Sequence, residues 1–442
     1  MSSSLASFAE SYADFGPASV NRFASTLDPA WVEEALAATG KASIRRRKLP
    51  ADRALWVVLG MCLFVDRSIE DVVRSLDLQM PGTKPVAASA LPQARYRLGP
   101  EPLEWLFQRV ADAWASPPGS ANYKGLRLFG IDGTHLRVPD SDANYEHFGK
   151  PSSRDGDAGY PQLRLAALMN LGTRLLCSAR FGPYNGGEVV LGTELFTEVP
   201  DDSLLLLDRG FFDTAAFAAH RTRGSNRHLL VRLRSNVRVD AVETLPDGSV
   251  LADIGRATGN PIRGRVISYQ HEGGDPSRVF TTLTDAERYP ADELVALYHE
   301  RWELEVAFDE LKTHMLQRRE CLRSKKPDGV AQEVWALLLT YNLLRREMYV
   351  VAVENGVPAK RVSFWTSLLR VRDFLIFAAM TSAPGNIPAR LADLDVDMAR
   401  LLLPERRSER RFPRHVKIKM SNYKRNRGRR SPKEIDEAQD ST

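Results

Sequence analysis

Four polar side chains at helical spacing carry the strongest chemical signal in this 442-residue sequence. Tyr298, Arg301, Glu305 and Lys312 are separated by three, four and seven residues. At about 100° per residue, they fall within an arc of roughly 60° on a helix that begins near Ala291. One face of that helix would carry a carboxylate between an aromatic hydroxyl and two cations, which suits a phosphodiester and a metal ion.

An apolar stripe beside this face predicts that the helix is docked on a hydrophobic core. The stripe consists of Leu297, Leu304, Phe308, Leu311 and Met315. Periodicity alone leaves a rival for the carboxylate, because Asp309 lies within about 40° of Glu305 at this pitch. Arg301 and Lys312 are natural phosphate clamps, although helical cations beside acids also form plain surface pairs. By the same count, the acids that point away from this face are Glu300, Glu303 and Glu310.

Two aspartates complete a set of three carboxylates. Asp132 ends the strand-like run LRLFGID before Gly133, and Asp208 ends the run SLLLLD before Arg209. Such positions lie at the rim of a sheet, where backbone approaches a ligand closely, although a single aspartate there is commonly a turn residue. Together with Glu305, they would hold two divalent ions about 4 Å apart for phosphoryl displacement. Oxygen ligands favour Mg²⁺ or Mn²⁺, and without metal the acids would repel one another or be partly protonated.

The remaining patterns predict the elements that position these residues, in two or three domains. Helices are expected at residues 29–38, 51–64, 68–76 and 101–115, with Ser68 as an N-cap. Strands follow at 126–132, 163–171, 175–182, 203–208 and 228–234, with helices at 188–199 and after Asp213. This order predicts a mixed sheet covered on both faces. Short strands at 235–290 look inserted, and helices at 330–354 and 362–380 predict core packing or self-association.

Two further segments suit nucleic acid. Gln93 and Arg97, four residues apart in ALPQARYRL, would share a helix face that enters a DNA groove, or else form a solvated face. Residues 406–433 hold thirteen Lys or Arg against the single acid Glu409, a net +12 compared with +5 for the whole chain. This tail would neutralise phosphates; its alternatives are a solubilising tail or a surface for acidic membranes. Its candidate DNA contacts are Arg410, Arg411, Arg414, Lys417 and Lys419.

Cysteine usage and the apolar segments indicate the compartment. Cys62, Cys177 and Cys321 are far apart and have neither disulfide-framework nor zinc-site spacing. The N-terminus lacks the basic start and long apolar run of a secretion signal, and the longest apolar run, residues 55–65, is too short to span a bilayer. We therefore expect a soluble cytosolic protein without a membrane partner.

Tyr298-x2-Arg301-x3-Glu305-x6-Lys312 resembles the Tyr-Arg-Glu-Lys motif of DDE transposases of the insertion sequence 4 family. The flanking run YHERWELEVAFDELK is similar to the third catalytic region of that family. GIDGTHLRVPD and LLLLDRGFFD look like its first and second Asp regions, in the right order, and the tail RRFPRHVKIKM adds to the likeness. The resemblance is strong over residues 125–312 and looser over the helical N-terminal part.

The resemblance implies an α/β fold with an RNase H-like mixed-sheet catalytic core and a β-rich insertion at about 235–290. Helical N-terminal and C-terminal regions would flank the core. The implied domains are a helical DNA-binding domain at 1–119, the catalytic domain at 120–325, a helical region at 326–404 and the basic tail at 405–442.

The implied activity is cut-and-paste transposition in the bacterial cytosol, close to the nucleoid. A homodimer would bind double-stranded DNA at terminal inverted repeats, nick it hydrolytically and transfer the free 3′-hydroxyl into target DNA. The resemblance favours Glu305 over Asp309 as the third acid, so Asp132, Asp208 and Glu305 would bind two Mg²⁺ or Mn²⁺ ions. The implied DNA contacts at the site are Tyr298, Arg301, Lys312 and Arg209.

One departure from the family concerns DNA hairpins. Related transposases that form them are thought to stack a flipped base on an aromatic side chain, often Trp, in the insertion. This chain has no Trp between residues 235 and 290; Tyr269, Phe280 and Tyr289 remain as candidates or as ordinary core residues. Two competing functions stay open: a catalytically silent DNA-binding regulator, and an RNase H-like nuclease without strand transfer. The retained acids argue against the first, and the flanking regions argue against the second.

Overall fold

The computed structural model describes residues 27–42, 49–78, 86–114, 122–153, 156–256, 259–270, 276–317, 321–381 and 384–404. The basic tail lies outside the described residues. The five candidate DNA contacts of that tail, Arg410, Arg411, Arg414, Lys417 and Lys419, therefore lie outside them as well. No helix of the described ranges is long and apolar enough to cross a membrane.

The N-terminal part is helical, as the sequence predicts. Its helices are α3 (Pro29–Ala38), α4 (Ala51–Leu63), α5 (Ile69–Ser75), α6 (Ala90–Leu98) and α7 (Glu101–Trp114). Ser68 is the expected N-cap of α5, because its hydroxyl oxygen accepts a hydrogen bond from the backbone N–H of Asp71 at 3.1 Å. On α6, both Gln93 and Arg97 are exposed, while Leu91, Ala94 and Leu98 are buried.

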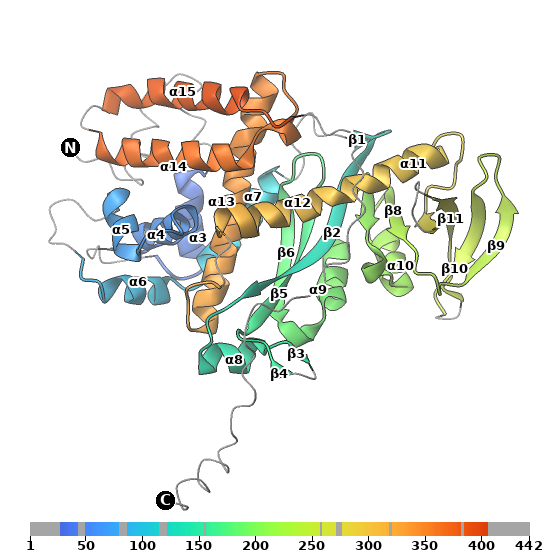
Figure 1. Ribbon diagram of the computed structural model, residues 1–442, viewed down its shortest axis with the longest axis horizontal. Helices are drawn as coiled ribbons and strands as arrows, with labels where there is room; N and C mark the ends of the chain where they lie inside the picture. The colour runs from blue at the N-terminus through green and yellow to red at the C-terminus, as the bar shows by residue number, and fades with distance from the viewer. Residues whose placement is uncertain are drawn as a thin grey trace, which may run out of the picture.

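A ten-stranded mixed sheet runs from the middle of the molecule, at β6, β5 and β2, to its right-hand edge in Figure 1, at β10 and β9. Its order is β6-β5-β2-β7-β8-β12-β11-β10-β9, and β1 pairs with β2. The first half contains β1 (Asn122–Tyr123), β2 (Leu126–Arg137), β5 (Gln162–Asn170), β6 (Leu176–Pro183), β7 (Ser203–Leu207) and β8 (Arg227–Arg232). The second half contains β9 (Val239–Thr244), β10 (Val250–Ile254), β11 (Ile262–Tyr269) and β12 (Ser277–Thr281). A separate two-stranded sheet joins β3 (Ser152–Ser153) and β4 (Gly156–Asp157).

The strand directions divide this sheet into a core and an insertion. β2, β5 and β6 form an antiparallel meander, whereas β2, β7 and β8 run parallel. This arrangement agrees with the RNase H-like core that the resemblance implies. β12 then pairs antiparallel with β8, and β11, β10 and β9 continue outward. The strand-rich segment before the site helix is therefore an insertion, as expected, and it extends the catalytic sheet.

Alternating leucines of β7 bury both faces of the sheet, as the sequence predicts. Leu204 and Leu206 join a core with α4, α7 and α13 (Pro327–Glu354). Leu205 and Leu207 join a second core with α10 (Thr214–Thr222) and the short helix η2 (Leu195–Glu198). Because successive strand residues point to opposite faces, one buried strand supports two helical layers. The other short elements are α8 (Asp142–Phe148), η1 (Tyr184–Gly186), α9 (Glu188–Glu194), η3 (Arg209–Phe211), η7 (Ala359–Arg361) and η8 (Pro384–Asn386).

The C-terminal helices pack into the hydrophobic core. This confirms core packing, one of the two alternatives that the sequence left open for them. α13 packs against α7 and α4 of the N-terminal part, and α14 (Phe364–Met380) packs against α13 and α15 (Ile387–Arg400). One continuous hydrophobic core contains Leu55 of α4, Leu106 of α7, Leu165 of β5 and Leu338 of α13. Helices from both ends of the chain thus share a core with one face of the sheet.

The segment that carries the four-part motif crosses the sheet (Figure 1). It begins at Ala291 as expected, but the prediction of one uniform α-helix is wrong. Its parts are α11 (Ala291–Tyr298), the 3-10 turn η5 (His299–Arg301), α12 (Trp302–Asp309) and the π-helical turn η6 (Glu310–Met315). The count of 100° per residue therefore fails at both ends of α12, although the apolar stripe packs as predicted from Leu304 to Met315.

Candidate active site

Strand register brings Asp132 and Asp208 to one edge of the parallel strand pair. The last residues paired between β2 and β7 are Ile131 and Leu207, and each aspartate directly follows one of them. Both Ile131 and Leu207 face the core under α10. Alternation then turns Asp132 and Asp208 toward the opposite face, where α12 lies.

The expectation that Asp132 ends a strand is wrong. β2 continues to Arg137, because its antiparallel pairing with β5 persists to the Arg137–Gln162 pair after the parallel pairing with β7 has stopped. Asp132 therefore lies within a strand that is paired on only one side at this point. Its Oδ1 accepts the backbone N–H of Gly133 at 2.9 Å, and its side chain is 17% exposed.

Gly133 also serves a different purpose from the one expected. It makes room for the Glu188 side chain, whose Cγ would lie 2.3 Å from an added Cβ. Glu188 begins α9, and its Oε2 accepts a hydrogen bond from Arg164 at 3.5 Å. This fourth carboxylate was missed from the sequence. Its signal was an acid directly after Gly186 and Gly187, at a helix start between the two Asp regions.

Arg301 joins the three candidate acids. Its Nη1 lies 3.4 Å from Asp132 Oδ2, and its Nη2 lies 3.0 Å from Glu305 Oε1. Burial lowers the pKa of Arg301, but Tyr298, Asp132 and Asp208 act in the opposite direction, and the pKa is raised overall. The guanidinium thus holds a positive charge among all three carboxylates in the metal-free protein.

The segment from α11 to η6, residues 291–315, is called the site segment below. Tyr298 connects it to the second aspartate. Its hydroxyl donates a hydrogen bond at 3.2 Å to the backbone carbonyl of Leu207, the residue before Asp208. Asp208 precedes η3 without forming a side-chain cap, while the Arg234 guanidinium donates to the carbonyls of Arg209 and Gly210 at 2.9 Å each. The loop after Asp208 is therefore fixed from outside, and the side chain of Arg209 is exposed.

Asp309 and Lys312 lie farther along the segment. Asp309 is exposed and accepts the Thr313 hydroxyl at 2.6 Å, whereas Glu305 contacts Arg301 and through it reaches Asp132. Lys312 is half-buried; burial lowers its pKa, and Asp309 partly offsets this. The structure therefore brings Asp132, Asp208, Tyr298, Arg301 and Glu305 together, with Lys312 beyond them on η6.

The pKa of Asp132 is raised to about 6, first because the carboxyl is buried and then because Glu188 and Glu305 repel its charge. The Gly133 N–H and Arg301 act against this rise. A partly protonated acid agrees with the expectation for three carboxylates without metal.

This shift gives a pH prediction for the metal-free protein. The folded state binds the Asp132 proton more tightly than the unfolded chain, so Asp132 destabilises the fold increasingly as pH rises from about 4 to about 6. We expect Asp132→Asn to raise the free energy of unfolding at pH 7 by roughly 3 kcal/mol, and to change it little at pH 4. Urea unfolding in EDTA at pH 4 to 7 checks this. A constant difference across the range would contradict it.

The donor chemistry of the site fits a hard divalent cation, since three carboxylates supply only oxygen ligands. Within the described residues, however, no group of three or more His, Cys, Asp or Glu is arranged to hold a metal ion. The Arg301 guanidinium lies between Asp132 and Glu305 instead. Metal loading would therefore require Arg301 to move away from at least one acid.

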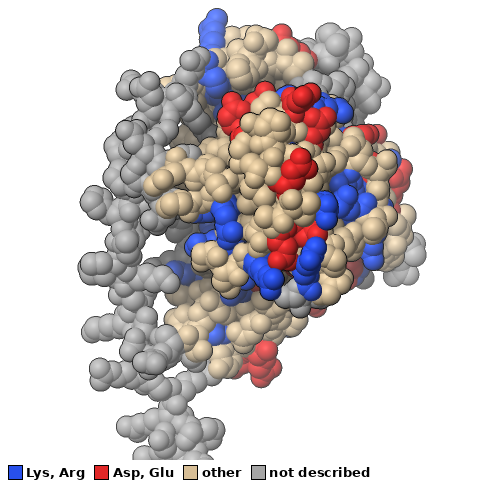
Figure 2. All heavy atoms as spheres, turned by 90° about the vertical axis from the view of Figure 1, so that its right-hand side faces the viewer, with Lys and Arg blue, Asp and Glu red and all other residues tan. Residues whose placement is uncertain are grey.

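Two of the three aromatic candidates in the insertion are too buried to stack a flipped base. Phe280 is 0% exposed and Tyr289 is 7% exposed, so both are core residues, whereas Tyr269 is half-buried. On the insertion's end of the molecule, cations and carboxylates lie side by side (Figure 2). Arg263 there pairs with Asp253, and Arg238 pairs with Asp240.

An RNase H-like sheet with two adjacent aspartates, crossed by a Tyr-Arg-Glu-Lys segment, defines the class of DDE transposases. The family model of the insertion element 4 transposase N-terminal region matches residues 17–108, and that of the transposase DDE domain matches residues 123–343. This chain belongs to the insertion sequence 4 family of DDE transposases. It is thus a DNA transposase, a nuclease and strand transferase that depends on divalent metal.

Curated relatives match from about half to most of the chain. It is 33% identical over 408 residues to the transposase InsG for insertion sequence element IS4 of Escherichia coli K12, covering 90% of this chain and 92% of that protein. InsZ of the same strain is 36% identical over 232 residues, 51% of this chain and 76% of InsZ. The solved piggyBac transposase synaptic complex with hairpin DNA is similar with a TM-score of 0.47 and 13% identity, over 88% of this chain and 86% of that one.

Proposed function

We propose that Asp132, Asp208 and Glu305 are the catalytic acids and that they bind two Mg²⁺ or Mn²⁺ ions. The observation that carries this proposal is the pair of Arg301 contacts that links Asp132 to Glu305, beside the point where the parallel pairing of β2 and β7 stops and Asp132 and Asp208 follow. When bound, such a metal pair activates the attacking oxygen and stabilises the leaving oxygen of a phosphodiester. Because the pKa of Asp132 is raised to about 6, cation binding would compete with protonation of this carboxyl at about pH 6 and below.

The cationic and aromatic groups of the site segment would hold the DNA backbone. Arg301 presents a planar guanidinium that suits two phosphate oxygens, and Lys312 supplies a second positive charge. Tyr298 is buried and its hydroxyl is bonded to the Leu207 carbonyl, so it would fix against β7 the segment that presents Arg301 and Lys312 to DNA. Exposed Arg209, next to Asp208, would contact the same strand of DNA.

The reaction would be cut-and-paste transposition in the bacterial cytosol, close to the nucleoid. A homodimer would bring two terminal inverted repeats together, nick them hydrolytically and join the 3′-hydroxyls to target DNA. Residues 1–119 would bind the repeats and residues 120–325 would carry out the chemistry. Residues 326–404 would support both parts, and the tail at 405–442 would add salt-sensitive affinity through Arg410, Arg411, Arg414, Lys417 and Lys419.

The test uses the full chain and a linear duplex that carries the element's own end. With Mg²⁺, we expect nicking at the terminal nucleotide of the element and, with target plasmid present, joined products; EDTA should stop both. A protein that binds the duplex but never cuts it with any divalent ion would be a regulator. Cutting without joining would leave a nuclease and remove the transfer step.

A further inference from the structure

We propose that a buried ionic cluster positions the site segment so that Glu305 faces the two aspartates. The cluster consists of Arg174, Glu303, Glu310, Tyr341 and Arg345. None of these residues belongs to the site, and the proposal rests on the function proposed for Glu305. Arg174 is the central positioning residue, because it is the member that comes from the catalytic sheet.

The contacts of the cluster join three parts of the fold. Arg174, at the turn between β5 and β6, pairs through Nε with Glu303 and through Nη1 with Glu310 at 2.9 Å. From α13, Arg345 pairs with Glu310, and the Tyr341 hydroxyl donates to Glu310 at 3.1 Å. The side chains of Arg174 and Glu303 are 3% and 2% exposed. The sheet and α13 therefore hold the site segment at both ends of α12.

Helix geometry turns these contacts into a constraint on Glu305. Leu304 lies on the sheet, since an added Cβ on Gly130 of β2 would be 2.5 Å from Leu304 Cδ1. Glu303 and Glu305 flank Leu304 in the sequence and point about 160° apart at the α-helical pitch. When Glu303 is fixed toward the β5–β6 turn, Glu305 must leave the opposite side of α12, where Arg301 and Asp132 lie.

The position of Glu305 is sensitive to rotation of α12 about its own axis. A side-chain carboxylate lies about 6 Å from the helix axis, so a turn of α12 by roughly 20° would move Glu305 on the order of 2 Å. Displacements of about 1 Å already cost catalytic sites large factors in rate. The pairing also keeps Glu303 and Glu310 away from metal that they would otherwise attract to the wrong face of the segment.

The turn that carries Arg174 is itself fixed. Arg174 has a φ of +60°, a left-handed backbone that a non-glycine residue rarely adopts. The Asn170 side-chain oxygen accepts the N–H groups of Gly172 at 2.9 Å and Thr173 at 3.3 Å. The Asn342 side chain of α13 bonds both backbone groups of Leu176, at 2.9 and 2.8 Å. Such a rigid support is what a positioning residue needs.

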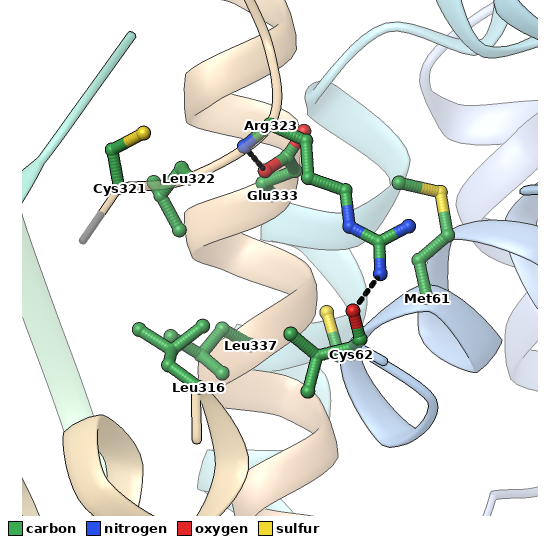
Figure 3. Close-up of a pocket in the computed structure, with 9 residues that line it drawn as sticks. Met61, Cys62, Leu316, Cys321, Leu322, Arg323, Glu333 and Leu337 are labelled. Carbon is green, nitrogen blue, oxygen red and sulfur yellow. Dashed lines mark hydrogen bonds between the residues drawn. The ribbon is translucent and has the colours of Figure 1, made fainter. Parts of the chain in front are cut away.

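A second buried ion pair provides a matched control. Arg95 of α6 pairs with Glu333 of α13 at 3.1 Å, and their side chains are 9% and 7% exposed. Figure 3 shows Glu333 beside Arg323 on the wall of a small pocket between α4 and α13, which Cys62 and Leu337 also line. Arg95→Met removes a buried, ion-paired arginine, as Arg174→Met does, but its partner Glu333 is on α13 and not in the site segment.

The experiment compares Arg174→Met, Arg174→Lys and Arg95→Met in the full chain. At saturating end duplex, we expect Arg174→Met to nick at least 100-fold more slowly than the parent, with its Kd for the duplex within about threefold. Arg174→Lys should nick at least tenfold faster than Arg174→Met, because its ammonium group restores a positive charge beside one of the two glutamates. Arg95→Met should lower the melting temperature by a similar amount but nick within about threefold of the parent.

Mn²⁺ binding to the protein–duplex complex, measured by electron paramagnetic resonance, separates this proposal from the proposed function. Arg174→Met should weaken Mn²⁺ binding at least tenfold, and Glu305→Ala should weaken it as well. Both losses are expected whether or not the parent protein nicks the duplex. Parental Mn²⁺ affinity in Arg174→Met would overturn the positioning role alone. Equal losses of nicking in Arg174→Met and Arg95→Met would also overturn it, since they would reflect general destabilisation.

Discussion

Replacing Glu305 with alanine should reduce nicking of the element end by at least three orders of magnitude, while Asp309→Ala stays within about threefold of the parent. Glu305 contacts Arg301 at 3.0 Å and so belongs to the cluster with Asp132, whereas Asp309 is exposed and bonds Thr313. Loss of a metal-binding carboxylate removes stabilisation that is made mainly in the transition state. Single-turnover cleavage of a labelled end duplex measures both variants.

Binding of the same duplex is the control for this result. Glu305→Ala should bind DNA as tightly as the parent or slightly more tightly, because it removes a negative charge from a surface that faces phosphates. A Glu305→Ala protein that cuts like the parent would exclude Glu305 as the third acid. If Asp309→Ala lost cutting at the same time, the rival carboxylate would take its place.

Arg301→Gln should have opposite effects on metal binding and on cleavage. In the protein without DNA, we expect its Mn²⁺ affinity to rise about tenfold, because the guanidinium no longer competes with a cation between Asp132 and Glu305. Nicking should fall at least 100-fold, since the phosphate loses its bidentate partner. Calorimetric titration of Mn²⁺, with and without end duplex, and single-turnover cleavage measure the two effects.

The matched control is Lys360→Gln, which removes a cation of η7 that pairs with the same segment but does not contact Asp132, Asp208 or Glu305. Lys360 pairs with Glu300, the neighbour of Arg301, at 2.5 Å. The Mn²⁺ affinity and the cleavage rate of Lys360→Gln should match those of the parent. If Arg301→Gln bound Mn²⁺ more weakly than the parent without DNA, Arg301 would be supporting the metal site rather than occupying it.

The two strands that lead to Asp132 and Asp208 could be predicted from the sequence because their signals are local. The leucine run before Asp208 is buried on both faces in β7, and the resemblance supplied the order of the acids. The end of β2 could not be read in this way. Glycine at 133 suggested a strand end, but the pairing partner that continues β2 is β5, and the reason for the glycine is Glu188.

The site segment shows a second limit of local patterns. Its apolar stripe and start were predictable, whereas the 3-10 turn before Trp302 and the π-helical turn from Glu310 were not. Periodicity correctly excluded Glu303 and Glu310 from the polar face, yet it gave no sign of their partner. That partner, Arg174, lies 129 residues from Glu303 in the chain, and no helical spacing encodes such a contact.

The burial of α13 between the N-terminal helices and the sheet also bears on the genetics of this element. A frameshift upstream of Pro327 would remove the helix that both parts need, so the shortened product would expose two hydrophobic faces and be degraded. Damaged copies of the gene would therefore fall silent and would not yield a truncated inhibitor that poisons intact copies. A naturally occurring inhibitor derived from this protein would have to retain its reading frame through Glu354.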